Sequence, residues 1–236
     1  MTPPPPPLPE CPIAQAERPW PSGTPQAEAP PPGAAVPRAG SGVADRSAAA
    51  SEPASDYRHR LRATPHGWPI RPAWCVWLEP TKQEGPAALW ELRWQRATLA
   101  ALASWQQLLP IRLVSDPTAA QVLIQRRRPP LRNGRASHGR AQLQLLVVQR
   151  QQRWQLEPRV EVLLSPGQAE PAMQATALHE LGHAFGLWGH SDQSGDALAA
   201  SPGPRPVLEL SRRDRATLRW LMQQPGLRQD LLPSTP

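Results

Sequence analysis

The chain lacks the long apolar segments that membrane insertion requires. Its 236 residues contain no run of about 18 apolar residues, and the amino terminus has no apolar stretch like the core of a secretory signal. We therefore expect no transmembrane segment, and these features leave the compartment of the protein open.

Cysteine is also scarce. The chain has two cysteines, Cys11 and Cys75, and neither belongs to a CxxC pair. Two such widely separated cysteines do not make the disulfide framework of a small secreted domain. Because Cys75 falls in an apolar stretch, we predict a packed thiol there, and we predict no special role for Cys11.

Lysine is nearly absent: Lys82 is the only one, so the formal net charge of +7 comes almost wholly from arginine. Between residues 126 and 159 there are nine arginines and one acid, Glu157. Aromatic residues that would stack on bases are few, and the chain has no DNA- or RNA-binding signature. We predict a solvated basic face and no nucleic-acid partner. Arginine-driven nucleic-acid binding is the alternative, and it would weaken steeply with salt.

Proline, by contrast, is abundant. Many of the 33 prolines lie near the amino terminus, in stretches such as PPPPPLPECP and EAPPPGAAVP. Because proline interrupts helices and sheets, we predict a Pro-rich disordered arm over residues 1–56. The domain then spans residues 57–232, a length at which a single core suffices, and residues 233–236 form a tail.

Within this domain, strand-like and helix-like segments alternate. The apolar stretch 74–78 predicts a buried strand, and residues 87–109, without internal glycine or proline, predict a long helix. A second helix is predicted over 171–187, and a third from the N-cap Ser211 to about residue 224. Further strands are predicted at 111–114, 121–125, 141–149 and 159–164. This order indicates an α/β fold, in which helices layer a sheet.

Residues 178–191, with the sequence LHELGHAFGLWGHS, hold three of the six histidines. In the HExxH portion, His179 and His183 are four residues apart, so on a helix they face the same side and can bind one ion. Composition alone would produce HExxH roughly 0.008 times in a chain like this one. The alternative, ordinary surface or hydrogen-bonded core histidines, is therefore much the weaker interpretation.

Each residue of the motif has a predicted role. His179 and His183 supply imidazole ligands to Zn²⁺, which accepts nitrogen ligands and has no redox chemistry. Glu180, one step round the helix, lies beside the ion and can take a proton from a water molecule and pass it to a leaving amine. Gly186 lets the chain turn back, which makes His190 the third ligand, with Asp192 as the fallback.

This motif resembles the zinc helix of the metzincins, specifically that of the matrixin-like peptidases, whose pattern is HExxHxxGxxH followed by a methionine-containing turn. The chain departs from the pattern twice. Its spacing is HExxHxxGxxxH, with one more residue before His190, and Leu198 stands at the position of the turn methionine. In both respects the chain resembles a bacterial matrixin-like variant that has an Asp-Ala-Leu turn.

The resemblance implies a metzincin-like catalytic domain: a twisted mixed sheet packed on a long helix and a zinc-binding helix, with a C-terminal helix. It further implies an edge strand near residues 141–148 that binds extended substrate by strand addition. A loop near residues 201–208 would wall the pocket for the residue after the scissile bond. An extracellular location follows from the resemblance alone.

Many matrixins also hold structural calcium and a second zinc ion ahead of the zinc helix. This chain offers His138 and many arginines there, so we expect one catalytic Zn²⁺ and no structural Ca²⁺. In such enzymes an amino-terminal cysteine can occupy the open zinc position. The sequence around Cys11, Pro-Glu-Cys-Pro-Ile, lacks the context of that switch.

The sequence therefore predicts a monomeric zinc-dependent endopeptidase that hydrolyses polypeptide substrates, with Glu180 as the general base. The alternative is a catalytically impaired, basic binding protein that retains the zinc helix as a structural element. Structural zinc sites have four protein ligands, so a fourth ligand from Asp192 or Cys11 would favour this alternative.

Overall fold

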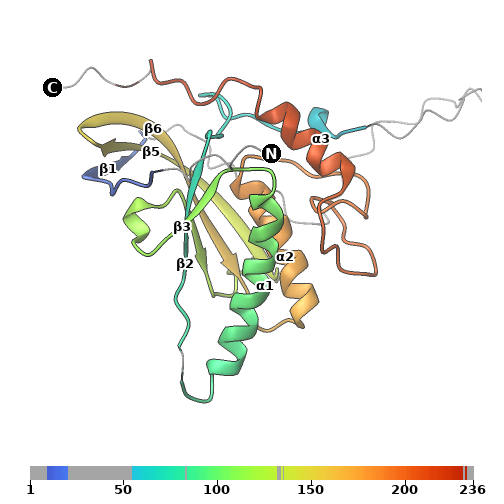
Figure 1. Ribbon diagram of the computed structural model, residues 1–236. Helices are drawn as coiled ribbons and strands as arrows, with labels where there is room; N and C mark the ends of the chain where they lie inside the picture. Colours follow the sequence, from blue (N-terminus) through green and yellow to red (C-terminus); the bar gives the residue numbers. More distant parts are fainter. Residues whose placement is uncertain are drawn as a thin grey trace, which may run out of the picture.

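The computed structural model describes residues 10–20, 55–82, 84–131, 134, 136–230 and 232. In this part the chain forms a mixed six-stranded sheet and three α-helices (Figure 1). The predicted α/β class is confirmed at this level. Among the described residues, no helix has the length and apolar character needed to cross a membrane.

The sheet combines parallel and antiparallel pairs. Its strands, in chain order, are β1 (Ala16–Pro19), β2 (Trp74–Leu78), β3 (Ile111–Val114), β4 (Val122–Gln125), β5 (Gly139–Arg150) and β6 (Arg153–Leu164). The order across the sheet is β1-β5-β6-β4-β2-β3, in which β3, β2, β4 and β6 are parallel neighbours. β5 runs antiparallel to β6, and β1 runs antiparallel to β5.

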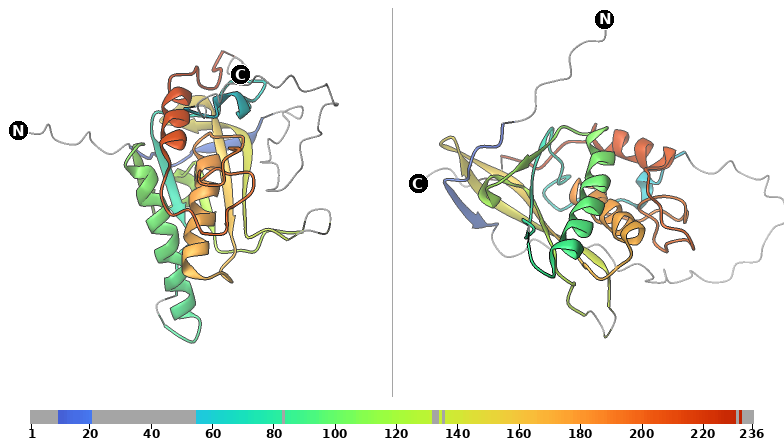
Figure 2. Two further views of the ribbon diagram at one scale, coloured as in Figure 1. Left: turned by 90° about the vertical axis from the view of Figure 1, so that its right-hand side faces the viewer. Right: turned by 60° about the horizontal axis from the view of Figure 1, so that its bottom comes forward.

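Two helices, α1 (Ala88–Gln106) and α2 (Glu170–Ala184), lie side by side on one face of the sheet (Figure 2). Two fully buried tryptophans of α1 join these layers. The Trp94 indole N–H donates to the carbonyl oxygen of Leu164 at the end of β6, at 3.2 Å, and that of Trp105 donates to Leu178 in α2, at 3.1 Å. Core packing thus sets the position of the helix that carries the histidine motif.

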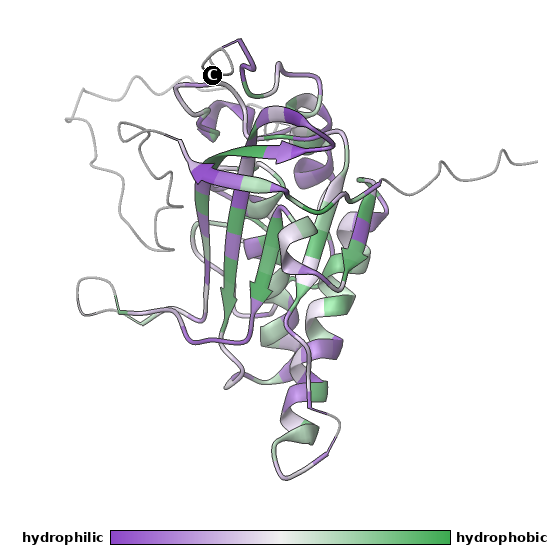
Figure 3. Cartoon of the chain, turned by 90° about the vertical axis from the view of Figure 1, so that its left-hand side faces the viewer, coloured by the Kyte–Doolittle hydropathy of each residue, from purple (hydrophilic) through white to green (hydrophobic). Residues whose placement is uncertain are grey.

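The strands are largely apolar with polar residues interspersed (Figure 3), and burial alternates along some of them. In β4, for example, Val122 and Ile124 are fully buried, whereas Leu123 and Gln125 are partly exposed. This alternation is expected of a sheet that has helices on one face. The third helix, α3 (Arg212–Leu221), packs beyond α2, near a short 3-10 helix at Arg58–Arg60.

Several predicted elements match the structure. β2 and β3 have the predicted bounds, and α3 begins at the predicted N-cap, where Ser211 and Asp214 form a capping box. β6 differs, because it begins six residues before the predicted start and includes Pro158. Proline is tolerated there because β4 pairs only with Val160–Leu163, so no strand on that side needs an N–H from Pro158.

The prediction of a disordered arm over residues 1–56 is wrong for residues 10–20. Ala16–Pro19 forms β1, which pairs with Leu146–Gln149 of β5. All four β1 residues are exposed, so the strand shows no buried face in its sequence pattern, and backbone pairing rather than side-chain burial holds it. Residues 1–9, 21–54 and 233–236, to which the rest of the arm and the tail were assigned, lie outside the described residues.

The prediction of two ordinary cysteines is also wrong. Cys11 and Cys75 form a disulfide, with their Cα atoms 5.9 Å apart, that joins the segment before β1 to strand β2. A pairing across 64 residues has no local sequence signature, because it depends on where the sheet places the amino-terminal segment. A free thiol at Cys11 is therefore not available as a zinc ligand.

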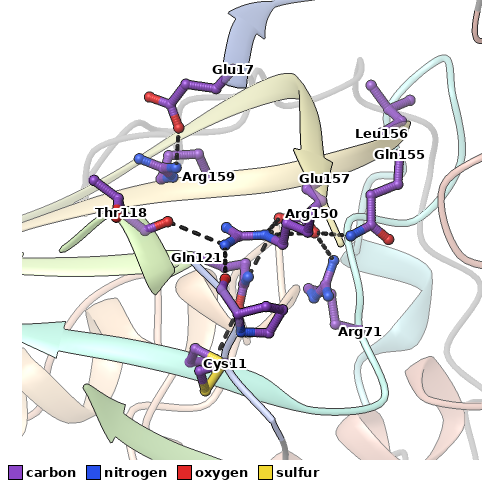
Figure 4. Close-up of polar contacts among 12 residues, drawn as sticks. Cys11, Glu17, Arg71, Thr118, Gln121, Arg150, Gln155, Leu156, Glu157 and Arg159 are labelled. Carbon is purple, nitrogen blue, oxygen red and sulfur yellow. Dashed lines mark hydrogen bonds and ion pairs between the residues drawn. A yellow bond between two sulfur atoms is a disulfide. The ribbon is translucent and has the colours of Figure 1, made fainter. Parts of the chain in front are cut away.

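A buried ion pair lies next to this disulfide (Figure 4). Arg150, at the end of β5, donates to both carboxylate oxygens of Glu157 at 3.2 Å, and each side chain is 3% exposed. The same guanidinium donates to the carbonyl oxygens of Pro12 and Thr118. Arg71 and Gln121 also contact Glu157, so the cluster links the amino-terminal segment to the sheet.

Removal of the disulfide is expected to destabilise the fold. Cys11→Ser combined with Cys75→Ser opens a loop of 64 residues, for which the chain-entropy relation gives up to about 4 kcal/mol of lost unfolding free energy. Urea unfolding of the two proteins in the absence of reducing agents measures this difference. Equal midpoints, or free thiols detected in the unreduced wild type, would contradict the disulfide.

Candidate metal centre

The helix that carries the motif ends three residues before its predicted end at residue 187, and the chain then reverses at Gly186. Pro171 lies in the first turn of α2, and the helix ends at Ala184. Gly186 has a φ of +106°, a conformation that favours glycine, and a side chain there would meet Ile70. The chain therefore turns back directly after the helix and brings residues 187–190 alongside it.

This turn brings three imidazoles together. The Nε2 atom of His183 lies 3.1 Å from that of His179 and 3.3 Å from that of His190. The candidate ligand atoms of the three residues all lie within 4.8 Å of one another. Among the described residues, this is the one group of three or more His, Cys, Asp or Glu side chains with such spacing.

The outer nitrogens of two of these rings contact backbone carbonyls. Nδ1 of His179 lies 2.8 Å from the Ala197 oxygen, and Nδ1 of His183 lies 2.8 Å from the Leu187 oxygen. A carbonyl oxygen can only accept, so each Nδ1 carries the proton and donates. In the neutral rings, the two facing Nε2 atoms then present lone pairs to each other, and these repel unless a cation lies between them.

Burial keeps these rings neutral. It lowers the pKa of His179, and it lowers the pKa of His183 well below the usual range, with a further contribution from the two neighbouring histidines. Burial also lowers the pKa of His190 to about 4. At neutral pH all three imidazoles are therefore uncharged, which is the form that coordinates metals.

The donor set fits Zn²⁺. Two nitrogens that are each about 2.0–2.1 Å from a tetrahedral ion lie about 3.3–3.4 Å apart, close to the separations of 3.1 and 3.3 Å between these Nε2 atoms. Three neutral imidazoles are typical of zinc and of other borderline transition metals, whereas calcium and magnesium prefer oxygen ligands. The residues thus suit a zinc ion held by three protein ligands.

Glu180 lies on the neighbouring face of α2, against the first residues of β5. The Ala141 amide donates a hydrogen bond to its carboxylate. Burial raises the pKa of Glu180 to about 8, although this hydrogen bond and the charge of Arg140 oppose the change. Gly139 makes room for the carboxylate, because a Cβ at that position would lie 2.7 Å from Oε1 of Glu180.

The segment around Leu198 contacts the helix that carries the histidines. Leu198 is fully buried, and its side chain fills the space beside Gly182, where a Cβ would approach it to 2.5 Å. The carbonyl of the preceding residue, Ala197, accepts the Nδ1–H of His179. Leu198 therefore packs against α2 at Gly182, and the backbone of the turn orients one imidazole.

Sequence reasoning missed the polar residues that hold this turn. The fully buried Asp214, predicted as part of a helix cap, also accepts the Ala197 amide at 2.9 Å and the Tyr57 hydroxyl at 2.7 Å. Arg213 donates to Asp196 at 3.0 Å. The capping pattern was visible in the sequence, but no signal could show that the cap faces the metal-site turn.

Asp192, the fallback ligand, does not join the histidine group. Its carboxylate pairs with Arg213 at 2.9 Å and Arg60 at 3.4 Å, and 47% of its side chain is exposed. The ion pairs lower its pKa, the hydrogen bond from Arg213 contributing most. Between the two candidates for the third position, the structure places His190 beside His183.

Several arginines of the basic stretch have partners within the fold. Arg126 pairs with Glu79 and Glu91, Arg150 with Glu157, and Arg159 with Glu17 at 2.6 Å. The predicted solvated face is therefore partly an internal network.

In the loop expected to wall a substrate pocket, the Leu208 carbonyl accepts a hydrogen bond from Gln174, which places that end of the loop beside α2.

Comparison with known proteins adds no assignment to this geometry. No protein-family model matches the chain, and a search of curated proteins finds no significant match.

Proposed function

We propose that the protein is a zinc-dependent endopeptidase of the matrixin-like type, with His179, His183 and His190 as zinc ligands and Glu180 as the general base. The observation that carries the proposal is the convergence of three Nε2 atoms, of which those of His179 and His183 have no proton to offer each other. An ion at this point would satisfy these lone pairs.

The number of available ligands favours a catalytic over a structural site. A structural zinc ion usually has four protein ligands, whereas a catalytic one has three and an open position. The two side chains considered for a fourth ligand are engaged elsewhere: Cys11 in the disulfide and Asp192 in ion pairs. This argues against the alternative of a basic binding protein with a purely structural zinc helix.

When bound, the zinc ion would supply Lewis acidity toward a water molecule and toward the scissile carbonyl. The Glu180 carboxylate would accept a proton from the attacking water molecule and deliver it to the leaving amine. The Ala141 amide holds this carboxylate at the sheet edge, and a cation beside it would lower the pKa that burial raises. β5 offers backbone N–H and C=O groups beside Glu180, and an extended peptide can pair with these groups.

A glutamine at position 180 is expected to abolish cleavage and leave metal binding intact. Glu180→Gln keeps the shape of the side chain but cannot accept a proton, so cleavage of an unfolded, alkylated protein should fall about 10²- to 10⁴-fold. The zinc content of each protein, measured by elemental mass spectrometry, should stay near one ion per chain. Glu209→Gln, at an exposed position, is the matched control.

Undiminished cleavage by Glu180→Gln would exclude the mechanism.

A change of one zinc ligand is expected to remove the metal. Zinc should be lost from His183→Ala but not from His59→Ala, which changes an exposed histidine. Full zinc content in His183→Ala would show that the metal binds elsewhere.

A methyl group at position 139 is expected to impair catalysis without removing the metal. In Gly139→Ala the new Cβ would crowd Thr176 and Glu180, at 2.5 and 2.6 Å, so the carboxylate must move. Displacement of a catalytic group by about 1 Å costs on the order of 100-fold in rate. Peptide cleavage and zinc content measure the two effects, and Gly195→Ala, where a Cβ would meet nothing, should change neither.

Loss of the buried carboxylate behind the turn is expected to weaken zinc binding. Asp214→Ala removes the acceptor of the Ala197 amide and thereby disturbs the carbonyl that orients His179. Substitutions behind metal ligands typically cost 10- to 100-fold in affinity, and we expect about tenfold because this contact is indirect. Competition with a chromophoric chelator measures it. Tyr57→Phe removes another partner of Asp214 and should leave the affinity within about twofold.

A further inference from the structure

β1 lies along the outer edge of the strand that leads to Glu180. Its four residues pair antiparallel with Leu146–Gln149 of β5, and the next residue, Trp20, donates its amide to the Leu145 carbonyl at 3.0 Å. Figure 1 shows β1 next to β5 at the margin of the sheet. The far end of β5 is therefore already occupied by this chain.

Three contacts hold β1 in place. The disulfide joins Cys11 to β2, the buried Arg150 donates to the Pro12 carbonyl, and Glu17 pairs with Arg159 at 2.6 Å (Figure 4). Since a covalent bond and a buried charge both anchor the segment, a peptide in solution will not readily displace it.

The same edge of β5 leads from β1 to Glu180. In an antiparallel pair, the backbone groups of alternate residues point to the same side. The Leu145 carbonyl points toward Trp20, so Leu143 and Ala141 point to that side as well. The hydrogen bond from the Ala141 amide to Glu180 agrees with this, because it places the carboxylate at the same edge.

No described strand pairs with β5 between Ala141 and Gln144 on this side. Because Trp20 lies opposite Leu145, three positions, those opposite Gln144, Leu143 and Gln142, separate it from the position opposite Ala141. A peptide that extends the line of β1 runs antiparallel to β5, with its amino-terminal side toward Trp20.

We propose that β1 is a fixed stop on the substrate-binding edge, which limits pairing with β5 to about three peptide residues before the residue opposite Ala141. The inference rests on the proposed peptidase function and adds a specificity determinant to it. Residues further from the scissile bond on the amino-terminal side meet Trp20, so they gain no backbone pairing and contribute little to kcat/KM.

The test uses the full chain and peptides built on a cleavage site identified in an unfolded protein. The carboxyl-terminal half of the peptide stays constant, and one to six residues precede the scissile bond. With the scissile bond after the residue opposite Ala141, four residues before the bond can pair with β5. For the wild type, kcat/KM should therefore rise about tenfold or more from one to four residues and change less than about twofold from four to six. A continued rise through the sixth residue would overturn the proposal.

A second arm releases β1. Arg18→Pro removes the amide that lies opposite Val147, and it is combined with Cys11→Ser and Cys75→Ser to cut the tether. The matched control has the same two serine substitutions together with Arg18→Ala, which keeps the amide of residue 18. Hydrogen exchange of residues 145–149 should be faster in the proline variant, and its kcat/KM should continue to rise beyond four residues. An unchanged length profile despite faster exchange would also overturn the proposal.

The failure of the stop and the failure of the peptidase function are distinguishable. If the peptides are cleaved with no plateau, the proposed function stands and the stop is wrong. If Glu180→Gln cleaves them as fast as the wild type, the proposed function itself is wrong. Should the proline variant not fold, the length profile of the wild type decides the proposal alone.

Discussion

The candidate metal site depends on the approach of two imidazole nitrogens that carry no proton. Nε2 of His179 and Nε2 of His183 lie 3.1 Å apart, while their Nδ1 protons are donated to backbone carbonyls. In a buried setting such lone pairs repel, and the surrounding fold must hold them together. Backbone contacts thus hold two of the rings in place, and His190 completes the cluster at 3.3 Å.

The rest of the fold supplies this support in layers. Trp105 of α1 holds the middle of α2 through the Leu178 carbonyl, and Leu198 fills the space beneath Gly182. Behind the turn, Asp214 joins the start of α3 to the Ala197 amide. The core, the turn and the last helix, which are far apart in the sequence, therefore act together on the orientation of His179.

The amino-terminal segment has a similar relationship to the sheet. Its contacts are a disulfide to β2, a buried arginine from β5 and backbone pairing along the same strand. It thereby shortens the edge of β5 that leads to the carboxylate of Glu180. The basic stretch also has an internal use here, because Arg150 and Arg159 both contact this segment rather than facing solvent alone.

Local patterns were enough to predict the α/β class, the bounds of β2 and β3, the capping box at Ser211 and the four residues of the candidate site. Each of these depends on neighbours within a few positions: apolar runs, a proline stop, a capping residue, or histidines one helical turn apart. The glycine at 186 belongs to this group, since its positive φ follows from the need to reverse the chain.

Long-range features required the tertiary structure. β1 has four exposed residues and no apolar pattern, so nothing in Ala16–Pro19 marks it as a strand until β5 provides a partner. The pairing of Cys11 with Cys75 and the contact of Asp214 with Ala197 likewise join residues far apart in the chain. The sequence by itself determined which side chains have the chemistry of metal ligands and of a proton acceptor. Only the packed sheet decided which backbone groups orient them and which edge stays open, because both depend on distances that no local pattern encodes.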